Sequence, residues 1–332
     1  MQSKLLDNLL NGCQGFPVLP IMTHPGIELT GKRVIDAVTD GQTHFDAIMA
    51  LRENFPHSLA STTIMDLSVE AEAFGAEVVF TDDEVPTVTG RLLNSADDVA
   101  ALAVPSLESG RIPQCLKANR LATAALDKPL FGGCIGPFSL AGRLYDMTEL
   151  MMAMYIEPET ATALLDKCTD FLLRYVKGIK ESGSAGVVMA EPASGLLSDE
   201  DCMTYSTRYV RRIVDELQDD NFTVILHNCG NMGQCTNAMV ASGAAALHFG
   251  NAIDMSQALA AVPADIAVMG NVDPIGIMKL GTPEMVAESV RKLLETAAGH
   301  PNFILSTGCD VPPASPAENI SAFFKAAGYT AD

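Results

Sequence analysis

The sequence is poor in basic residues, and this shortage narrows the range of partners. Its 332 residues include 21 Lys and Arg against 41 Asp and Glu, so the formal net charge is −20. Nucleic-acid binding depends on basic side chains that neutralise phosphates, which disfavours a nucleic-acid partner. The same balance disfavours a substrate with many carboxylates unless basic residues gather at the site. We interpret the excess acid as a solvated surface that aids solubility.

Long apolar segments and sorting signals are also missing. No stretch of about 18 residues is both apolar and uncharged, so we expect no membrane span. The N-terminus carries Asp7 where a secretion signal would need an apolar segment. These absences predict a cytoplasmic protein. The chain has no linker, repeat or low-complexity segment either, so residues 1–332 are predicted to form a single domain.

Short β-rich runs alternate with longer helical stretches along the chain. We predict strands at residues 17–22, 58–65, 129–135, 186–190, 222–227, 245–249, 266–270 and 303–307. Helical patterns lie among them at residues 113–126, 158–180, 198–217, 283–298 and 316–327. Eight such units predict an α/β fold of the closed (β/α)8 TIM-barrel type. A doubly wound open sheet is the alternative, although the chain lacks the Gly-x-Gly-x-x-Gly motif of its dinucleotide-binding form.

Three side chains suited to metal binding follow two of the predicted strands. His227 and Cys229 lie two residues apart at the end of one strand, so their side chains point to the same side. Cys309 follows the last predicted strand, 80 residues later. In such barrels the strand ends form the active site, so the three can converge. One imidazole and two thiolates suit zinc, and three protein ligands leave a fourth position open for substrate.

The remaining cysteines and other polar residues have plainer explanations. We expect Cys134, Cys168 and Cys202 to be small core residues, since a cytoplasmic chain of this length rarely forms disulfides. His24 precedes Pro25, which favours a role in a turn. Four further candidates stand at predicted strand ends: Asp66 to hydrogen-bond substrate or cap a helix, Glu191 to face the pocket or pair with a base, and Asn231 and Asn271 to orient ligands.

Several segments resemble the uroporphyrinogen decarboxylase superfamily, in the branch that contains the methylcobamide:coenzyme M methyltransferases. These segments are residues 66–75, 136–142, 226–231, 270–274 and 307–313. The resemblance implies a (β/α)8 barrel and a zinc ion held by His227, Cys229 and Cys309. It also implies that zinc activates a small thiol, such as coenzyme M, to take a methyl group from a methylated corrinoid on a partner corrinoid protein.

The chain departs from the superfamily pattern at two places. Decarboxylases carry an Arg-rich motif after the first strand, whereas residues 21–26 here contain no Arg. We therefore place decarboxylation behind methyl transfer, although Asp66 matches the acid that holds the pyrrole N–H groups in those enzymes. Related zinc sites also use a Glu about twenty residues after His-x-Cys. That position here is Gly250 or Asn251, so His248, Asp254 or water is expected to replace it.

Two further functions stay open at this point. The same ligand pattern resembles the core of cobalamin-independent methionine synthases, which methylate homocysteine. A non-catalytic corrinoid- or tetrapyrrole-binding module would keep the barrel without the chemistry, although intact His227, Cys229 and Cys309 count against it. The sequence leaves the acceptor thiol, the original methyl donor and the oligomeric state undetermined.

Overall fold

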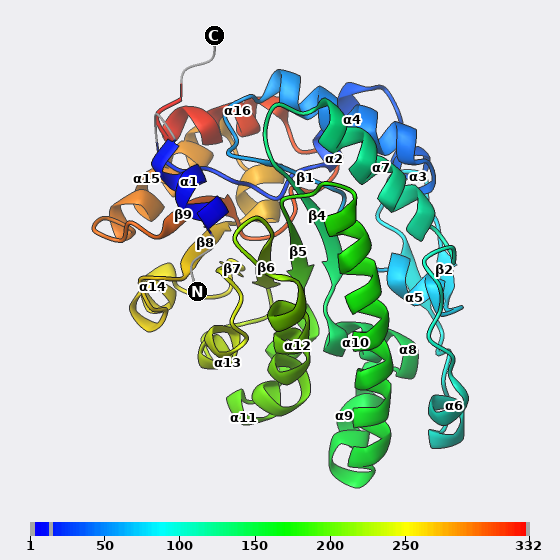
Figure 1. The fold of residues 1–332 in the computed structure, drawn as a ribbon. Helices are drawn as coiled ribbons and strands as arrows, with labels where there is room; N and C mark the ends of the chain where they lie inside the picture. Colours follow the sequence, from blue (N-terminus) through cyan, green and yellow to red (C-terminus); the bar gives the residue numbers. More distant parts are fainter. Residues whose placement is uncertain (1–3, 13–15, 330–332) are drawn as a thin grey trace.

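The computed structural model describes residues 4–12 and 16–329 and shows an α/β barrel (Figure 1). Within this part of the chain, seven parallel strands form a sheet in the order β1-β4-β5-β6-β7-β8-β9. Their bounds are Ser61–Thr62 (β1), Leu130–Ile135 (β4), Gly186–Ala190 (β5), Thr223–Asn228 (β6), Ala246–Phe249 (β7), Ala267–Val272 (β8) and Phe303–Thr307 (β9). Strands β5, β6, β7 and β9 are buried along their whole length, as parallel strands covered on both faces should be.

An eighth extended segment closes the barrel between β9 and β1. The Leu19 N–H donates to the Leu305 carbonyl and the Leu305 N–H donates to the Pro17 carbonyl, each over 2.9 Å. On the other side, the Leu59 N–H donates to the Val18 carbonyl over 2.9 Å. These bonds complete the ring of parallel segments, so the predicted TIM barrel is confirmed.

Two of the predicted strands are shorter than their sequence patterns indicate. The segment 17–22 forms a single parallel bridge, and the segment 58–65 keeps only β1 as regular strand. Side chains replace part of the backbone pairing here. Met22 N–H donates to Thr62 Oγ1, and the Thr23 hydroxyl donates to the Thr62 carbonyl. Both segments are extended, as predicted. Hydrogen bonds through the Thr23 and Thr62 hydroxyls take the place of regular backbone pairing between them.

Helices surround the barrel and lie across its ends. Their bounds are Lys4–Gly12 (α1), His24–Leu29 (α2), Val34–Thr39 (α3), Gly41–Asn54 (α4), Val69–Ala73 (α5), Ala96–Ala101 (α6), Ile112–Ala125 (α7), Pro137–Tyr145 (α8), Met147–Ile156 (α9), Pro158–Glu181 (α10), Pro192–Leu196 (η1), Asp199–Cys202 (α11), Met203–Thr207 (η2), Arg208–Leu217 (α12), Thr236–Ala241 (α13), Met255–Ala261 (α14), Pro274–Lys279 (η3), Pro283–Thr296 (α15) and Ala317–Ala326 (α16). The strands point toward the lower part of Figure 1, where α8, α9 and α11 lie at the carboxyl end of the barrel.

The predicted helices are found, with one difference at residues 198–217. The pattern at 198–217 is divided into α11, the π-helical turn η2 and α12, which follow one another without a break. The starts expected from capping chemistry are present, because Ser198 and Thr282 accept hydrogen bonds from N–H groups one turn later. A short antiparallel hairpin, β2 (Glu77–Val79) with β3 (Thr87–Thr89), was not predicted because its strands are only three residues long.

A compact layer of apolar side chains fills the middle of the barrel, and polar residues lie between it and the carboxyl end of the strands. Phe131, Val188, Ile225 and Ile304 belong to this buried cluster, which the strands contribute. Because side chains two apart share a face, His227 follows Ile225 on the interior side of β6. The interior is therefore apolar at its middle and becomes polar at the carboxyl end.

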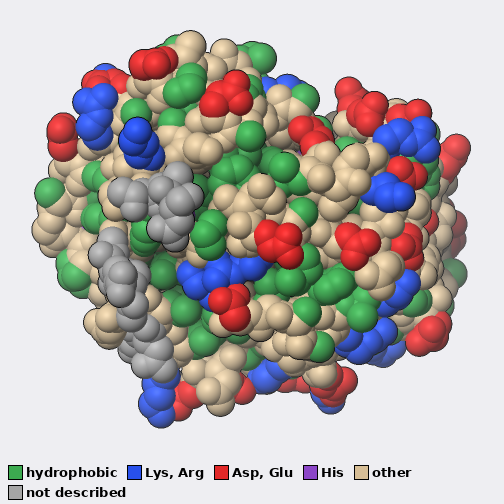
Figure 2. All heavy atoms as spheres, turned by 90° about the horizontal axis from the view of Figure 1, so that it is seen from above, with side chains coloured by type: hydrophobic (Ala, Val, Ile, Leu, Met, Phe, Trp, Pro, Cys, Tyr) green, Lys and Arg blue, Asp and Glu red, His purple; other side chains and the backbone are tan. Residues whose placement is uncertain are grey.

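The surface carries charges of both signs. Figure 2 shows acidic and basic side chains interspersed with apolar ones over the face seen from above. Among the described residues, no helix combines the length and the apolar character needed to cross a membrane. Cys134, Cys168 and Cys202 are buried, as expected for core cysteines.

Candidate metal centre

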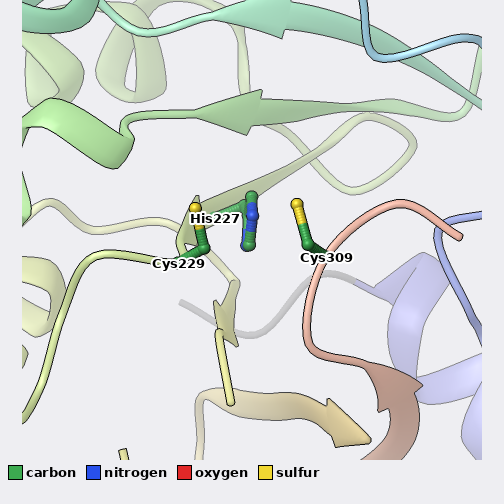
Figure 3. Close-up of side chains that lie close together, drawn as sticks. All are labelled: His227, Cys229 and Cys309. Atoms are coloured by element: carbon green, nitrogen blue, oxygen red, sulfur yellow. The ribbon is translucent and has the colours of Figure 1, made fainter. Parts of the chain in front are cut away.

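Three side chains from distant parts of the chain meet at the carboxyl end of the barrel (Figure 3). His227 lies near the end of β6, Cys229 follows that strand directly, and Cys309 lies in the loop after β9. One ligand atom from each residue lies within 4.8 Å of the other two. Figure 3 shows the two thiols on either side of the imidazole ring, so the predicted triad is assembled.

The two imidazole nitrogens of His227 differ, because one contacts a neighbouring histidine and the other lies free beside the thiols. Its Nδ1 lies 2.8 Å from His248 Nδ1. Its Nε2 is buried and has no hydrogen-bond partner among the described residues. A buried polar atom without a partner costs free energy, which a bound ligand would offset. Here that atom is the nitrogen beside the two thiols.

His248 and Ser306 continue the hydrogen-bond chain away from the thiols. His248 Nε2 lies 2.8 Å from Ser306 Oγ. Burial, together with the neighbouring His227, lowers the pKa of His248 well below its ordinary value, so this ring is neutral. In one set of tautomers that fits these distances, His227 Nδ1–H donates to His248 Nδ1 and His248 Nε2–H donates to Ser306 Oγ. That tautomer leaves the Nε2 lone pair of His227 free to bind a metal.

The two thiols interact with each other. A hydrogen bond from Cys309 lowers the pKa of Cys229 to about 7, and the same bond raises the pKa of Cys309 to about 12. One thiol therefore ionises readily, while the second needs a positive charge nearby to lose its proton. A bound divalent cation supplies such a charge, because metals deprotonate the thiols that coordinate them.

Close backbone packing holds Cys229 in place. The Asn228 side chain accepts a hydrogen bond from the Gly230 N–H over 2.9 Å, which turns the chain sharply after β6. Gly250, in the loop after β7, lies so close that an added Cβ would stand 2.6 Å from the Cys229 Cα. Any side chain at position 250 would displace Cys229, so glycine is required there.

The donor set fits zinc. Tetrahedral zinc with bonds of about 2.3 Å to sulfur and 2.0–2.1 Å to nitrogen separates its ligand atoms by roughly 3.7 Å. The three atoms here lie within 4.8 Å, so small side-chain rotations bring them to that spacing. The unpartnered Nε2 and the paired thiols match the nitrogen and sulfur ligation that zinc prefers.

A cavity of about 230 Å³ opens onto the three ligands. Most of its other walls are apolar, from Ile21, Met65, Leu67, Val85, Ala190, Pro192, Pro312 and Pro313. His24 and Asp310 are the other polar residues of the wall, and His24 Nδ1 lies 3.1 Å from an Asp310 carboxylate oxygen. Burial works against the charged imidazole, but Asp310 and other acids outweigh it and raise the pKa of His24. His24 therefore lines the cavity, whereas the sequence analysis favoured only a role in a turn.

Asp66 and Glu191 lie beyond the walls of this cavity. Both Asp66 oxygens are engaged, one by Ser68 and the other by the Arg111 guanidinium. Glu191 is buried and accepts hydrogen bonds from the Phe138 and Ser139 N–H groups at the start of α8, and from the Ser206 hydroxyl. Burial raises the pKa of Glu191. A catalytic role for either carboxylate stays a prediction.

The two asparagines organise loops around the centre. Asn231 accepts hydrogen bonds from the Gly233 and Cys235 N–H groups in the loop after β6. Asn271 donates to the Gly250 and Ile253 carbonyls and so holds the loop after β7. Their predicted part in binding a cofactor stays a prediction.

No side chain near position 250 joins the group of three as a fourth ligand among the described residues. Gly250 offers no side chain. Asn251 is exposed to solvent and packs beside Gly308. Asp254 caps α14 by accepting from Ser256, and both nitrogens of His248 are already paired. Among the described residues no carboxylate replaces the glutamate that the resemblance led us to look for.

Three features of the site were not found from sequence. They are the His227–His248 contact, the His24–Asp310 pair and the close approach of Gly250 to Cys229. His24, His248 and Asp310 each stand at a predicted strand end, and that position was the available signal. Their pairing depends on strand register, since His227 lies directly beside His248 across β6 and β7.

Comparison with known proteins places the chain in a family. The sequence matches the uroporphyrinogen decarboxylase (URO-D) family over residues 13–329 and therefore belongs to it. It is 30% identical over 267 residues to the methylcobamide:CoM methyltransferase MtbA of Methanosarcina acetivorans, covering 79% of this chain and 77% of the relative. It is 28% identical over 278 residues to the uroporphyrinogen decarboxylase of Serratia proteamaculans, covering 80% of this chain and 77% of the relative.

A solved structure supports the fold. A methyltransferase from Methanosarcina mazei superimposes with a TM-score of 0.87 over 98% of both chains, at 22% sequence identity. The family predicted from the sequence motifs is thus confirmed, together with its barrel. Relatives with two different activities match this sequence, so the residues of the site must distinguish between them.

Proposed function

We propose that this protein is a zinc-dependent methyltransferase that moves a methyl group from a methylated corrinoid, carried on a partner protein, to a small thiol. The observation that carries the proposal is the buried, unpartnered His227 Nε2 beside the Cys229 and Cys309 thiols. A zinc ion held by these three residues would stabilise the substrate thiolate at neutral pH. The similarity to a methylcobamide:CoM methyltransferase supports this choice.

The protein's own residues bind and orient the thiol. The apolar walls of the cavity exclude water from the reacting sulfur, which strengthens electrostatic interactions there. His248 fixes the ring and tautomer of His227, and Gly250 allows Cys229 to approach. The substrate sulfur then forms its bond to the methyl carbon, and the electron pair of the cobalt–carbon bond stays on the corrinoid. The cobalt chemistry belongs to the corrinoid, and the protein supplies position and charge.

Decarboxylation is the less favoured activity. A porphyrinogen with many carboxylates needs basic partners, and the described walls of the cavity contain no Lys or Arg. Asp66, the counterpart of the decarboxylase acid, is already paired with Arg111. Methyl transfer to homocysteine needs the same ligands, and it is an outcome of the experiment below.

The test measures zinc and methyl transfer on purified protein. Metal analysis should give about one zinc per chain, as one site of three protein ligands predicts. Free methylcobalamin should lose its methyl group, followed by absorbance, when the zinc protein is mixed with 2-mercaptoethanesulfonate or with homocysteine. Removal of zinc by a chelator should stop the reaction, and added zinc should restore it. A zinc protein that demethylates methylcobalamin with no thiol would refute the proposal.

A further inference from the structure

His24 and Asp310 form a polar pair in the wall of the metal cavity, and the proposed methyl transfer has so far given the pair no role. His24 stands at the start of α2, and Asp310 directly follows Cys309 in the loop after β9. His24 Nδ1 lies 3.1 Å from an Asp310 carboxylate oxygen. Both residues line the cavity that the three candidate ligands also line, so the pair and the metal centre face the same space.

The imidazole of His24 is buried and has an unused nitrogen. Its side chain is only 2% exposed, and its Nε2 has no hydrogen-bond partner among the described residues. The contact with Asp310 is made on the Nδ1 side of the ring. Burial has therefore taken Nε2 out of water without a replacement from the described chain, a cost that a molecule in the cavity would offset.

The surroundings of His24 favour a positive charge on its ring. Burial by itself would lower the pKa of His24, but the nearby acids Asp310, Asp66 and Glu28 outweigh burial and raise this pKa. Burial, with His24 beside it, lowers the pKa of His44 to about 3, so His44 adds no competing positive charge. The acids thus make the neutral His24 ring a stronger base than an ordinary buried imidazole.

A thiol that binds in this cavity as a thiolate has to give up its proton there. The walls are mostly apolar, and His24 and Asp310 are the polar wall residues besides the three candidate ligands. The candidate ligands are taken up by the metal, and a carboxylate is ordinarily a weaker base than an imidazole. Among the described walls, His24 is therefore the group best suited to receive the proton.

We infer that His24 Nε2 accepts the proton of the substrate thiol, and that Asp310 stabilises the charged ring that results. The inference rests on the proposed function, because it needs a thiol that binds as a thiolate beside Cys229 and Cys309. A base placed within hydrogen-bond reach of the proton it takes contributes about 100- to 10,000-fold to a rate. His24 is thus a catalytic residue, and Asp310 is a positioning residue that acts through it.

The step balances without a further reactant. The S–H bond of the thiol breaks, its proton passes to His24 Nε2, and its electron pair stays on the sulfur. That pair forms the new bond to the methyl carbon, while the pair of the cobalt–carbon bond stays on the corrinoid. His24 releases the proton to solvent once the thioether has left, which restores the neutral ring.

A binding experiment without a corrinoid counts the protons. The zinc proteins are titrated with 2-mercaptoethanol by calorimetry at about pH 8, in two buffers with different heats of ionisation, which gives the number of protons released. The wild type should keep the thiol proton on His24, whereas His24→Gln should release about one proton more per chain. Asp310→Asn should give an intermediate number, because the ring loses the carboxylate that stabilises its charge. His300→Gln, at a half-buried histidine before β9 and so at the other end of the barrel, is the control and should match the wild type.

Transfer rates provide a second measure. With free methylcobalamin, His24→Gln should lower kcat/KM for 2-mercaptoethanol about 100- to 1,000-fold. For 2,2,2-trifluoroethanethiol, whose thiol is more acidic and ionises with less help, the loss should be less than about 10-fold. A residue that only holds the fold would lower both rates alike.

The two measurements separate this inference from the proposed function. Equal proton numbers in the wild type and His24→Gln, or equal losses of rate with the two thiols, would refute the role of His24 even if methyl transfer occurs. An Asp310→Asn number equal to that of the wild type would remove Asp310 from the step. If the wild type transfers no methyl group yet the proton numbers differ, the proposed function fails and the role of His24 stands. A wild type that binds no thiol would refute both.

Metal analysis and circular dichroism establish that each variant keeps its zinc and its fold. His24→Asn repeats both measurements if the glutamine variant does not fold.

Discussion

Two sets of buried polar side chains at the same end of the barrel use their atoms in opposite ways. Around the ends of β6 and β9, His227 Nε2 has no partner in the described chain and faces two thiols. After β1 and β5, the carboxylates of Asp66 and Glu191 accept hydrogen bonds from the protein's own donors at both of their oxygens. The first set keeps a nitrogen free for a ligand, whereas both carboxylates of the second set are saturated by protein donors.

The difference separates residues that bind from residues that hold the fold. A saturated buried carboxylate replaces its lost water with protein donors and so stabilises the elements that supply them. An unsaturated nitrogen beside two thiols lowers stability unless something binds there. Both sets contain residue types that enzymes use, so residue type alone does not assign a role. The predictions below test this distinction, beginning with the largest effect.

Cys309→Ala should remove most of the bound zinc and abolish methyl transfer to a thiol. Only His227 and Cys229 would remain, and two ligands hold zinc far more weakly than three. Metal analysis and the methylcobalamin assay measure both results. Cys168→Ala, in the buried core of α10, is the control and should keep its zinc. Undiminished turnover by Cys309→Ala would contradict the metal centre.

Glu191→Gln should destabilise the fold while the folded protein keeps its zinc. The amide would direct its NH2 group at one of the two N–H groups that now bind Glu191, so a buried donor loses its acceptor. The free energy of unfolding should fall by on the order of 3 kcal/mol in urea denaturation. Glu295→Gln, which is exposed on α15, should have little effect. Normal stability with impaired turnover would instead support the predicted catalytic role.

Glu70→Gln should change how stability depends on pH. Burial raises the pKa of Glu70 from its ordinary 4.5 to about 7, so the folded protein holds this proton more tightly than the unfolded chain does. The wild type therefore loses stability as pH rises from about 4.5 to 7, and the glutamine variant lacks this loss. Relative to the wild type, the unfolding free energy of the variant should therefore increase by on the order of 3 kcal/mol between pH 4.5 and 7. A pH-independent difference in urea denaturation would show that Glu70 titrates normally.

His248→Leu should weaken zinc binding without removing a ligand. His227 would lose the acceptor that sets its tautomer and ring orientation. Loss of such a supporting partner typically lowers metal affinity about 10- to 100-fold. Competition with a chelating dye measures the affinity, and Ser306→Ala, one step further along the chain of hydrogen bonds, should have a smaller effect. Equal affinities in the wild type and His248→Leu would show that the imidazole pair has no influence on the metal.

Local patterns were enough to predict much of the barrel. The segments 186–190 and 303–307 form β5 and β9 with the expected bounds, because each is a short apolar run suited to a buried parallel strand. The segment 17–22 was expected to form a full strand but forms a single bridge. Whether an extended segment becomes a regular strand depends on the neighbours that the fold brings to it.

The meeting of the three candidate metal ligands was predictable for a similar local reason, whereas their surroundings were not. His227 and Cys229 share a direction because residues two apart in an extended chain do, and the nature of an imidazole and a thiol already selects zinc. No local pattern predicts that His248 supports His227 or that Gly250 lies against Cys229. Those facts depend on strand register and on contacts between segments far apart in the chain. The sequence alone determined which side chains could bind a metal and which of them point the same way along a strand. The tertiary structure decided which polar atoms find partners, because those partners come from segments far apart in the chain.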